Sequence, residues 1–245
     1  MIYHYTVLRW IQQRARPRTY LEIGVDEGSS FALATSARRA VGVDPEPRLV
    51  HSLPPNGVIF AETSDEFFGR PEIAEILGTV DVAFIDGLHL YEQALRDFVN
   101  LEPHMAAEGV VLLHDVLPPD PAWATRDERP GAWTGDVWKV VPILRRHRPD
   151  LTVEVIDVLC GLAIVTGLDP GDRSLANRFA EVVAEFADVA YAPVSAGVAP
   201  TWAELSRRVP TYQRAGTGVW IRLQRDRARW LTRSLRRRFG ALRST

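Results

Sequence analysis

Short apolar runs alternate with helical stretches along the first two thirds of the chain. A run rich in Val, Ile and Leu that ends at a polar residue is typical of a strand buried on both faces of a parallel sheet. The sequence contains five runs of this kind, at residues 19–24, 40–44, 57–61, 80–86 and 109–114. Because helical intervals separate them, the pattern predicts a parallel sheet with right-handed crossovers and helices on both faces.

The segments that flank these runs extend the prediction. Residues 3–16 and 136–146 have the periodicity of amphipathic helices, and Asp136 is a suitable N-cap for the second. Residues 151–158 and 161–166 are two apolar runs separated by two residues, which predicts a hairpin. We therefore expect an α/β fold with a Rossmann-like, doubly wound sheet of seven strands, mostly parallel, ending in an antiparallel C-terminal hairpin.

The chain is expected to divide into a core and an appendage. Residues 1–167 contain the predicted sheet, and a stretch without periodicity at about 117–135 is expected to be a lid. Residues 168–245 are expected to form a helical appendage, with a helix at 172–187 and a basic amphipathic tail. Because this appendage exceeds what such a sheet needs, we expect a homo-oligomer.

Composition excludes several classes of protein. The 245 residues are 46% apolar and 24% charged, which is ordinary for a globular chain and excludes general disorder. Apolar runs are far shorter than the roughly 20 residues of a membrane span, and the N-terminus does not resemble a secretory signal, so a cytoplasmic protein is expected. Cys160 is the only cysteine, which excludes an internal disulfide and predicts a buried thiol.

The net charge of −2 hides an uneven distribution. Residues 222–245 carry nine Arg and one Asp, about +8, which leaves about −10 on the rest of the chain. Leucine and tryptophan recur at helical spacing within this tail. A basic amphipathic helix docks on its own domain or a second copy, lies on an anionic membrane surface, or binds an acidic partner, whereas nucleic-acid binding is not expected.

The run from Tyr20 to Ser30 has the features of a ligand-binding turn. Gly24 and Gly28 permit a sharp turn and a close approach of the backbone to a ligand. A helix predicted to begin near Ser29 would present free N–H groups to a carboxylate or phosphate. Asp44 ends the next strand, where a carboxylate can accept hydrogen bonds from a ribose diol. The spacing therefore predicts a ligand that contains a nucleoside.

This turn differs from the dinucleotide fingerprint Gly-x-Gly-x-x-Gly, because Asp26 occupies the position of the middle glycine. Its pattern, Glu-x-Gly-x-x-x-Gly-x-Ser, resembles motif I of the class I S-adenosylmethionine (SAM) dependent methyltransferases. The resemblance implies that Glu22 orients the methionine end of SAM, that Ser30 contacts the methionine carboxylate and that Asp44 holds the ribose.

Polar residues also follow the later predicted strands. Ser64 and Asp65 follow the third, Asp86 follows the fourth, and Asp115 follows the fifth. Ligands of open α/β sheets bind outside the carboxyl ends of the strands, so these residues are expected to meet Gly24 and Asp44 at one edge. We expect Ser64 and Asp65 to bind the cofactor.

Two further motifs sharpen the resemblance. The segments are Phe84-Ile-Asp-Gly-Leu-His-Leu-Tyr91 and Gly109-Val-Val-Leu-Leu-His-Asp-Val116, followed by Thr134-Gly-Asp-Val-Trp-Lys139. In this order they resemble the methyltransferase branch that modifies hydroxyls of sugars and other natural products, often with a divalent metal. The resemblance covers about residues 18–166. It implies a SAM-dependent O-methyltransferase that acts on a sugar or specialised metabolite.

Four residues are candidates for the chemistry. His89 has an ordinary pKa near 6.5, which suits proton removal at neutral pH. Asp86 and Asp115 could hold the acceptor, with a divalent ion such as Mg²⁺ or Mn²⁺. Metal-using relatives carry adjacent carboxylates where this chain has His114 and Asp115, and a set of one His and two Asp suits Mn, Fe, Ni or Zn better than Mg. Either Asp86, His114 and Asp115 bind a metal, or His114 is a second acid–base group and no metal binds.

Aromatic residues near these motifs have weaker assignments. Tyr91 and Trp138 are expected to pack in the wall of the site, and Asp97 to cap or pair on a helix. Trp123 and Trp133 in the lid could stack on a flat acceptor or anchor the loop.

Two other functions are compatible with the same sheet. A nicotinamide-dependent oxidoreductase would use it, although Asp26 disfavours the dinucleotide fingerprint. A non-catalytic nucleotide-binding module with a membrane- or partner-docking tail is the second alternative. The intact set of Asp86, His89 and Asp115 disfavours it.

Overall fold

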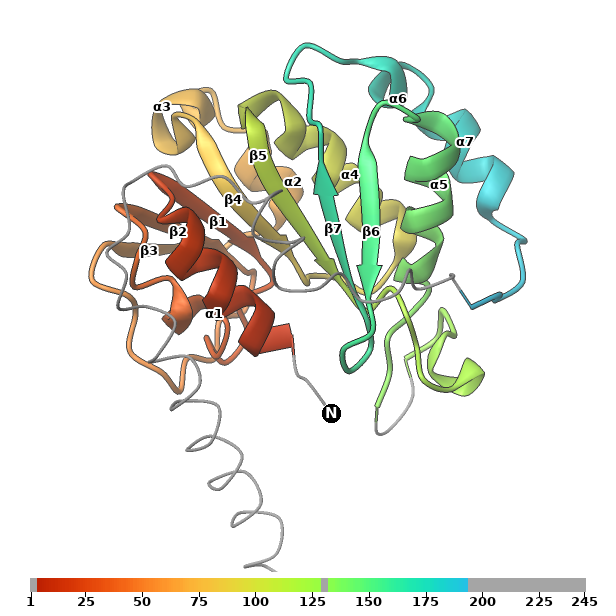
Figure 1. Cartoon of the computed structure of the whole chain (residues 1–245), viewed down its shortest axis with the longest axis horizontal. Helices are drawn as coiled ribbons and strands as arrows, with labels where there is room; N and C mark the ends of the chain where they lie inside the picture. Colours follow the sequence, from red (N-terminus) through yellow and green to blue (C-terminus); the bar gives the residue numbers. More distant parts are fainter. Residues whose placement is uncertain (1–3, 129–131, 194–245) are drawn as a thin grey trace, which may run out of the picture. The chain divides into compact units, whose positions relative to one another are not determined.

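The computed structural model describes residues 4–128 and 132–193. Its centre is a seven-stranded sheet with the strand order β3-β2-β1-β4-β5-β7-β6 (Figure 1). The strands are β1 Thr19–Ile23, β2 Arg39–Val43, β3 Gly57–Phe60, β4 Val80–Ile85, β5 Met105–His114, β6 Thr152–Ile156 and β7 Leu162–Thr166. The predicted fold class is therefore confirmed.

The first five strands are parallel, and β7 pairs antiparallel with both β5 and β6. Every residue of β1 and β4 is buried, which explains why most of them are apolar, and the polar exceptions are Thr19, Glu22 and Asp81. The chain moves outward from β1 through β2 to β3, then returns to start β4 on the other side of β1. The point between β1 and β4 is where the winding reverses, so ligand binding is expected at the carboxyl ends of these two strands.

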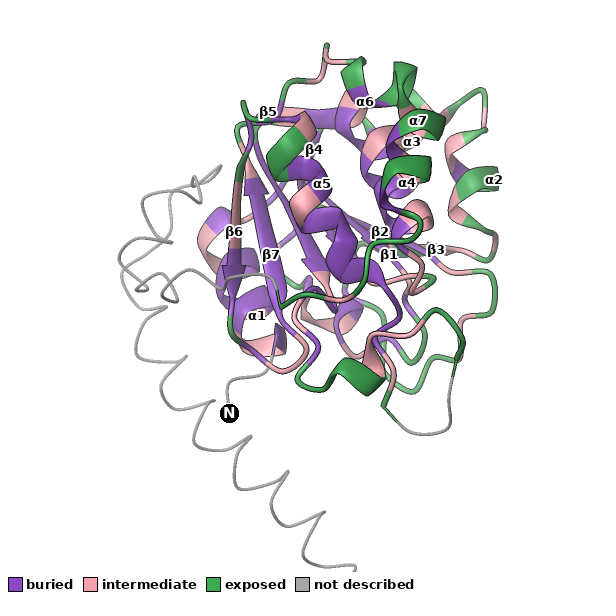
Figure 2. Ribbon diagram, turned by 90° about the vertical axis from the view of Figure 1, so that its right-hand side faces the viewer, coloured by how far each residue is buried: buried purple, intermediate pink, exposed green. Residues whose placement is uncertain are grey.

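Helices cover the sheet unequally. Figures 1 and 2 show α1 on one face and α4 and α5 on the opposite face. The α-helices are α1 His4–Ala15, α2 Ser64–Phe68, α3 Ile73–Leu77, α4 Tyr91–Leu101, α5 Val140–His147, α6 Ser174–Asn177 and α7 Phe179–Phe186. Four 3₁₀ turns complete the set, η1 Phe31–Leu33, η2 Glu102–His104, η3 Pro121–Trp123 and η4 Val137–Lys139. The apolar side chains of α4, α5 and the central strands form one continuous core.

Three local predictions were wrong. No α-helix begins near Ser29, because the chain makes only the short 3₁₀ turn η1, and Ser30 gives no side-chain cap. The helix predicted at 172–187 is interrupted at Arg178, which lies outside helical geometry between α6 and α7. Asp136 does not cap the helix that follows it.

The side chain of Asp136 instead accepts the backbone N–H of Tyr91 at 3.0 Å and so satisfies the first turn of α4. It also pairs with Arg126 at 2.8 Å and Lys139 at 3.2 Å. Sequence reasoning missed this role because the helix that Asp136 caps begins 45 residues earlier.

The basic tail at 222–245 and the end of the predicted appendage lie outside the described residues. None of the helices in the described part of the chain is long and apolar enough to cross a membrane.

Candidate active site

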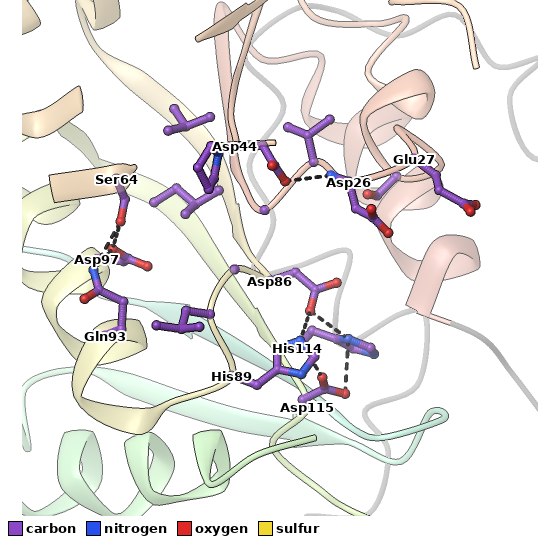
Figure 3. Close-up of a pocket in the computed structure, with 18 of the residues that line it drawn as sticks. Asp26, Glu27, Asp44, Ser64, Asp86, His89, Gln93, Asp97, His114 and Asp115 are labelled. Carbon is purple, nitrogen blue, oxygen red and sulfur yellow. Dashed lines mark hydrogen bonds and ion pairs between the residues drawn. The ribbon is translucent and has the colours of Figure 1, made fainter. Parts of the chain in front are cut away.

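A cavity of about 960 Å³ lies at the carboxyl ends of the strands. It is lined by residues that follow β1, β2, β3, β4 and β5, together with the start of α1 and part of the lid. We call the side formed by Gly24, Ser30, Asp44 and Ser64 the cofactor half. The side formed by Asp86, His89, His114 and Asp115 is the acceptor half (Figure 3).

Gly24 lies where β1 and β4 come closest. Its φ is +86°, and a Cβ at this position would be 2.1 Å from the carbonyl oxygen of Asp86. Glycine is therefore required because two strand ends meet here, in addition to any approach by a ligand. Gly28 also has positive φ, at +78°, but it does not line the cavity.

Glu22 lies beneath the cavity and does not line it. Its carboxyl group accepts hydrogen bonds from the Tyr20 hydroxyl at 2.5 Å and the Ser30 hydroxyl at 2.6 Å. Burial raises the pKa of Glu22 to about 8, although these two hydrogen bonds oppose the increase. In this arrangement Glu22 positions Ser30, and only Ser30 reaches the cavity.

Asp44 lies at the cavity edge, as the sequence predicted. Its two carboxylate oxygens accept the backbone N–H groups of Asp26 and Glu46, each at 2.8 Å. Asp26 has a φ of +44° and pairs through its side chain with Arg48 at the rim. The residue that replaces the middle fingerprint glycine therefore adopts the left-handed backbone that glycine favours.

Ser64 and Asp65 both line the cavity, but Ser64 faces a partner that the sequence did not indicate. Its hydroxyl donates to Asp97 at 2.6 Å, and Gln93 donates to the same carboxylate at 3.0 Å (Figure 3). Burial raises the pKa of Asp97 to about 6. Asp97 does pair on a helix, as predicted, but it is also a buried acid in the cavity wall. Asp65 pairs with Arg96 at 2.9 Å.

The acceptor half brings all four predicted groups together. Nδ1 of His114 lies 3.1 Å from Asp86 and 3.3 Å from Asp115. Nε2 of His89 lies 3.2 Å from Asp115 and 3.8 Å from Asp86. Figure 3 shows the two imidazoles and two carboxylates pointing toward one another.

These groups perturb one another strongly because they are buried together. Burial would lower the pKa of His114, but Asp86 and Asp115 outweigh it and raise this pKa to about 9. Burial raises the pKa of Asp115 to about 6, with His114 opposing the increase. Burial would also raise the pKa of Asp86, yet His114 and His89 hold it well below its usual range. Acids and bases with divergent pKa values in one cavity are typical of a catalytic site.

Sequence reasoning missed His4. This residue begins α1, is only 7% exposed and lines the cavity, with its ring centroid 3.9 Å from that of His114. Burial and the neighbouring His114 lower its pKa to about 3, so the ring is neutral at ordinary pH. Among the described residues neither ring nitrogen has a hydrogen-bond partner. No spacing or motif in the sequence could have placed His4 here, because α1 precedes the first strand.

The donor set fits a divalent metal ion. Ligand atoms of His4, Asp86 and His114 all lie within 4.8 Å of one another, and so do those of Asp86, His89 and Asp115. Two ligands held about 2.1 Å from one ion are themselves about 3 Å apart, and 3.1 Å separates His114 from Asp86. His114 would exchange its proton for the metal, because metal ligands must be deprotonated.

Part of the segment predicted to be a lid lines the cavity beside the acceptor half. Trp133 lines the cavity, with its ring centroid 5.1 Å from that of His89, and its indole N–H donates to the Thr125 carbonyl at 2.6 Å. Trp123 instead anchors the loop, since its carbonyl accepts both the N–H and the hydroxyl of Thr134. The backbone carbonyl of Trp123 and the indole N–H of Trp133 thus both tie the loop together, and stacking of either ring on an acceptor stays a prediction.

Three other residues differ from expectation. Tyr91 and Trp138 are buried but do not line the cavity, because their rings pack toward Val183 and Tyr191. Cys160 is only half-buried and lines the cavity beside Asp115. Burial raises the pKa of its thiol to about 12, so the thiol stays protonated.

Comparison with known proteins supports the fold. Residues 21–116 match the family described as "Methyltransferase domain". The fold is similar to that of the O-methyltransferase TomG from Streptomyces achromogenes, involved in tomaymycin synthesis and solved with SAM (18% identity, 66% of this chain and 78% of that chain, TM-score 0.51). It is also similar to an O-methyltransferase from Bacillus cereus in complex with S-adenosylhomocysteine (13% identity, 66% and 79%, TM-score 0.51).

No curated protein matches the chain significantly. The matched segment runs from β1 to the residue after Asp115, so it contains all the residues that define the two halves. It does not include α1 or the lid. The family match therefore covers residues 21–116, and the fold of the chain is similar to that of O-methyltransferases.

Proposed function

We propose that the protein transfers the methyl group of SAM to a hydroxyl of a small molecule, a sugar or specialised metabolite. The observation that carries this proposal is the pair of His89 and Asp115, 3.2 Å apart in the same cavity as the cofactor half. A hydroxyl nucleophile must lose a proton during methyl transfer, and a histidine held by a carboxylate suits that task.

The cofactor half supplies the binding of the methyl donor. The hydroxyl of Ser30 donates its one proton to Glu22, so Ser30 would contact the methionine carboxylate through its backbone N–H. Asp44 keeps free lone pairs beyond its two backbone hydrogen bonds and would accept from the ribose hydroxyls. Ser64 and Asp65 line the part of the cavity beyond Asp44, where they would contact the rest of the nucleoside.

The acceptor half supplies the proton acceptor. Nε2 of His89 faces Asp86 and Asp115, so we assign its hydrogen to Nε2 and the lone pair to Nδ1. Nδ1 is buried and has no partner among the described residues. In the reaction the hydroxyl oxygen attacks the methyl carbon, the C–S bond breaks to give S-adenosylhomocysteine, and Nδ1 takes the hydroxyl proton.

The carboxylates of Asp86 and Asp115 orient the acceptor. Positioning two bound reactants supplies much of the rate enhancement in such reactions. A divalent ion, when bound by Asp86 and His114, would lower the pKa of the acceptor hydroxyl. Trp133 offers an aromatic face beside His89, on which a flat acceptor or sugar ring can stack.

The experiment is an incubation of the full chain with SAM and a panel of glycosylated and phenolic metabolites. Mass spectrometry should detect the gain of one methyl group on a hydroxyl and equimolar S-adenosylhomocysteine. Methylation of nitrogen or carbon acceptors in place of hydroxyls would contradict the proposal. So would a chain that binds SAM but converts no member of a panel that a known O-methyltransferase converts alongside.

A further inference from the structure

His4 is buried in the wall of the cavity, and no residue in the described part of the chain satisfies its ring nitrogens. The residue is only 7% exposed, and neither Nδ1 nor Nε2 has a hydrogen-bond partner among the described residues. A buried polar atom without a partner is costly, and native structures keep few of them. A ring that is merely packed would be replaced at lower cost by phenylalanine, so the two free nitrogens point to a missing partner.

The surroundings of His4 show what that partner is. Its ring contacts the ring of His114, and the ligand atoms of His4, His114 and Asp86 lie within 4.8 Å of one another. Two imidazole nitrogens and one carboxylate oxygen would occupy three coordination positions of an ion and leave the others open for further ligands. Nitrogen-rich sets of this kind favour Zn²⁺, Fe²⁺ and similar ions, whereas Mg²⁺ prefers oxygen.

We propose that His4, His114 and Asp86 form a binding site for a nitrogen-preferring divalent transition-metal ion such as Zn²⁺ or Fe²⁺. The ion joins the start of α1 to the carboxyl ends of β4 and β5. His89 and Asp115 remain outside this set as the proton-accepting pair. The inference deepens the proposed function, because the metal adjoins the proposed methyl-transfer site. The role of the metal in catalysis rests on that proposed function.

The site predicts that α1 is part of the catalytic apparatus as well as a cover for the sheet. The ligands come from three elements that are far apart in sequence, namely α1, the turn after β4 and the last residue of β5. A metal bound to all three links α1 to the sheet and stabilises the folded chain in proportion to its occupancy.

The test is metal binding by the untagged full chain after removal of metals with a chelator. Zn²⁺ and Mg²⁺ are titrated by calorimetry, and Co²⁺ serves as a visible-spectrum probe for the zinc site. We expect one Zn²⁺ per chain, bound more tightly than Mg²⁺, with the intense bands of nitrogen-ligated Co²⁺. Neither SAM nor acceptor is present, so failure here leaves the methyl-transfer proposal standing.

His4→Phe retains the volume of the ring and removes both nitrogens, and His4→Gln is a second variant with a polar side chain. Each should weaken Zn²⁺ binding by roughly 10- to 100-fold or more, the loss that even an outer partner of a metal ligand produces. His51→Ala is the matched control, because His51 is exposed and does not line the cavity. Circular dichroism and thermal unfolding without metal establish that each variant is folded.

Ring ¹⁵N chemical shifts of the six histidines in the wild-type chain provide a readout that needs no variant. Zn²⁺ should shift the ring nitrogens of two ligating histidines in the proposed site. A wild-type chain that binds neither Zn²⁺ nor Co²⁺ would overturn the proposal. So would tighter binding of Mg²⁺ than of Zn²⁺, Zn²⁺ ligation by a single histidine, or unchanged affinity in folded His4 variants.

Discussion

The two halves of the cavity differ in how far their polar groups are already satisfied. In the cofactor half, Asp44 accepts two backbone N–H groups and Ser30 donates to Glu22. In the acceptor half Nδ1 of His89, and beside this half both nitrogens of His4, are buried without a partner among the described residues. Unsatisfied buried groups reduce stability, and those of His4 and His89 belong to residues that line a cavity where a ligand can supply the partner.

The difference separates two tasks. The cofactor half is a preformed cradle that holds its shape through its own hydrogen bonds, which suits repeated binding of one invariant ligand. In the proposed function, the buried donors and acceptors of the acceptor half serve reacting groups and an ion, and its two imidazoles and two carboxylates pair with one another. Changes in the first half should therefore alter SAM affinity, and changes in the second should alter turnover.

The strongest test of this division is His89→Ala. Loss of a general base typically lowers the rate by roughly 10²–10⁴-fold, because the acceptor hydroxyl then loses its proton only to water. The Kd for SAM, measured by calorimetry, should stay within about twofold, since His89 is placed on the acceptor side. Steady-state kinetics with an acceptor from the panel measure kcat.

His51→Ala serves as the control for this variant, because it removes an exposed histidine that does not line the cavity. Its kcat should equal that of the wild type. If His89→Ala retains full turnover, His89 is not the base. If it loses SAM affinity as much as turnover, the two halves are not separable.

Residues of both halves could be predicted from the sequence. Gly24, Asp44, Asp86 and Asp115 each follow a strand of their own, and parallel strands bring their carboxyl ends to one edge whatever the details of packing. The meeting of these residues at one edge therefore follows from the order of strands and polar residues alone. The sheet was predictable for the same reason, since strands buried on both faces leave a continuous apolar signal.

The missed residues all depend on contacts between distant segments. His4 reaches the cavity only because α1 packs on one face of the sheet with its first residue at the cavity, and Asp136 caps a helix that begins 45 residues earlier. Glu22 was expected in the site but lies beneath it, because alternate residues of a strand point to opposite faces. A motif gives the order of such residues but not the direction of each side chain.

The second test concerns Glu22, the support beneath the cofactor half. Its pKa in the folded chain is about 8, above its ordinary value of 4.5, because it is fully buried. Below about pH 4.5 Glu22 is protonated in both the folded and the unfolded state, so folding buries no charge at this position. As pH rises toward 8 only the unfolded state ionises, and the free energy of unfolding should fall by up to about 1.4 kcal/mol per pH unit.

Glu22→Gln removes the ionisation and keeps an oxygen acceptor for Ser30 or Tyr20. Urea unfolding at several pH values between 4.5 and 8 gives the difference in unfolding free energy between the variant and the wild type. This difference should grow in favour of the variant with rising pH and level off above pH 8. A difference that is constant with pH would mean that Glu22 ionises as readily in the folded chain as in the unfolded one.

The mildest test is Asp44→Asn, which mirrors the change at His89. The substituted amide keeps the shape of the side chain but presents an N–H₂ group where the carboxylate of Asp44 accepts a backbone N–H or a ribose hydroxyl. A hydrogen bond to a charged group is worth about 1.5–3 kcal/mol, so SAM should bind roughly tenfold more weakly or worse. The kcat at saturating SAM should stay within about twofold, because Asp44 is separated from the acceptor half.

Asp26→Asn is the matched control for charge, since Asp26 also lines the cavity but engages Arg48 in an exposed ion pair. Such a pair contributes about 0–1 kcal/mol, so this variant should change SAM affinity far less than Asp44→Asn. Equal losses in the two variants would mean that the negative field of the rim attracts the cationic cofactor without a specific ribose contact. A selective loss at Asp44 would assign the ribose to that carboxylate, and unchanged turnover would show that the cradle and the chemistry are separate parts of one cavity.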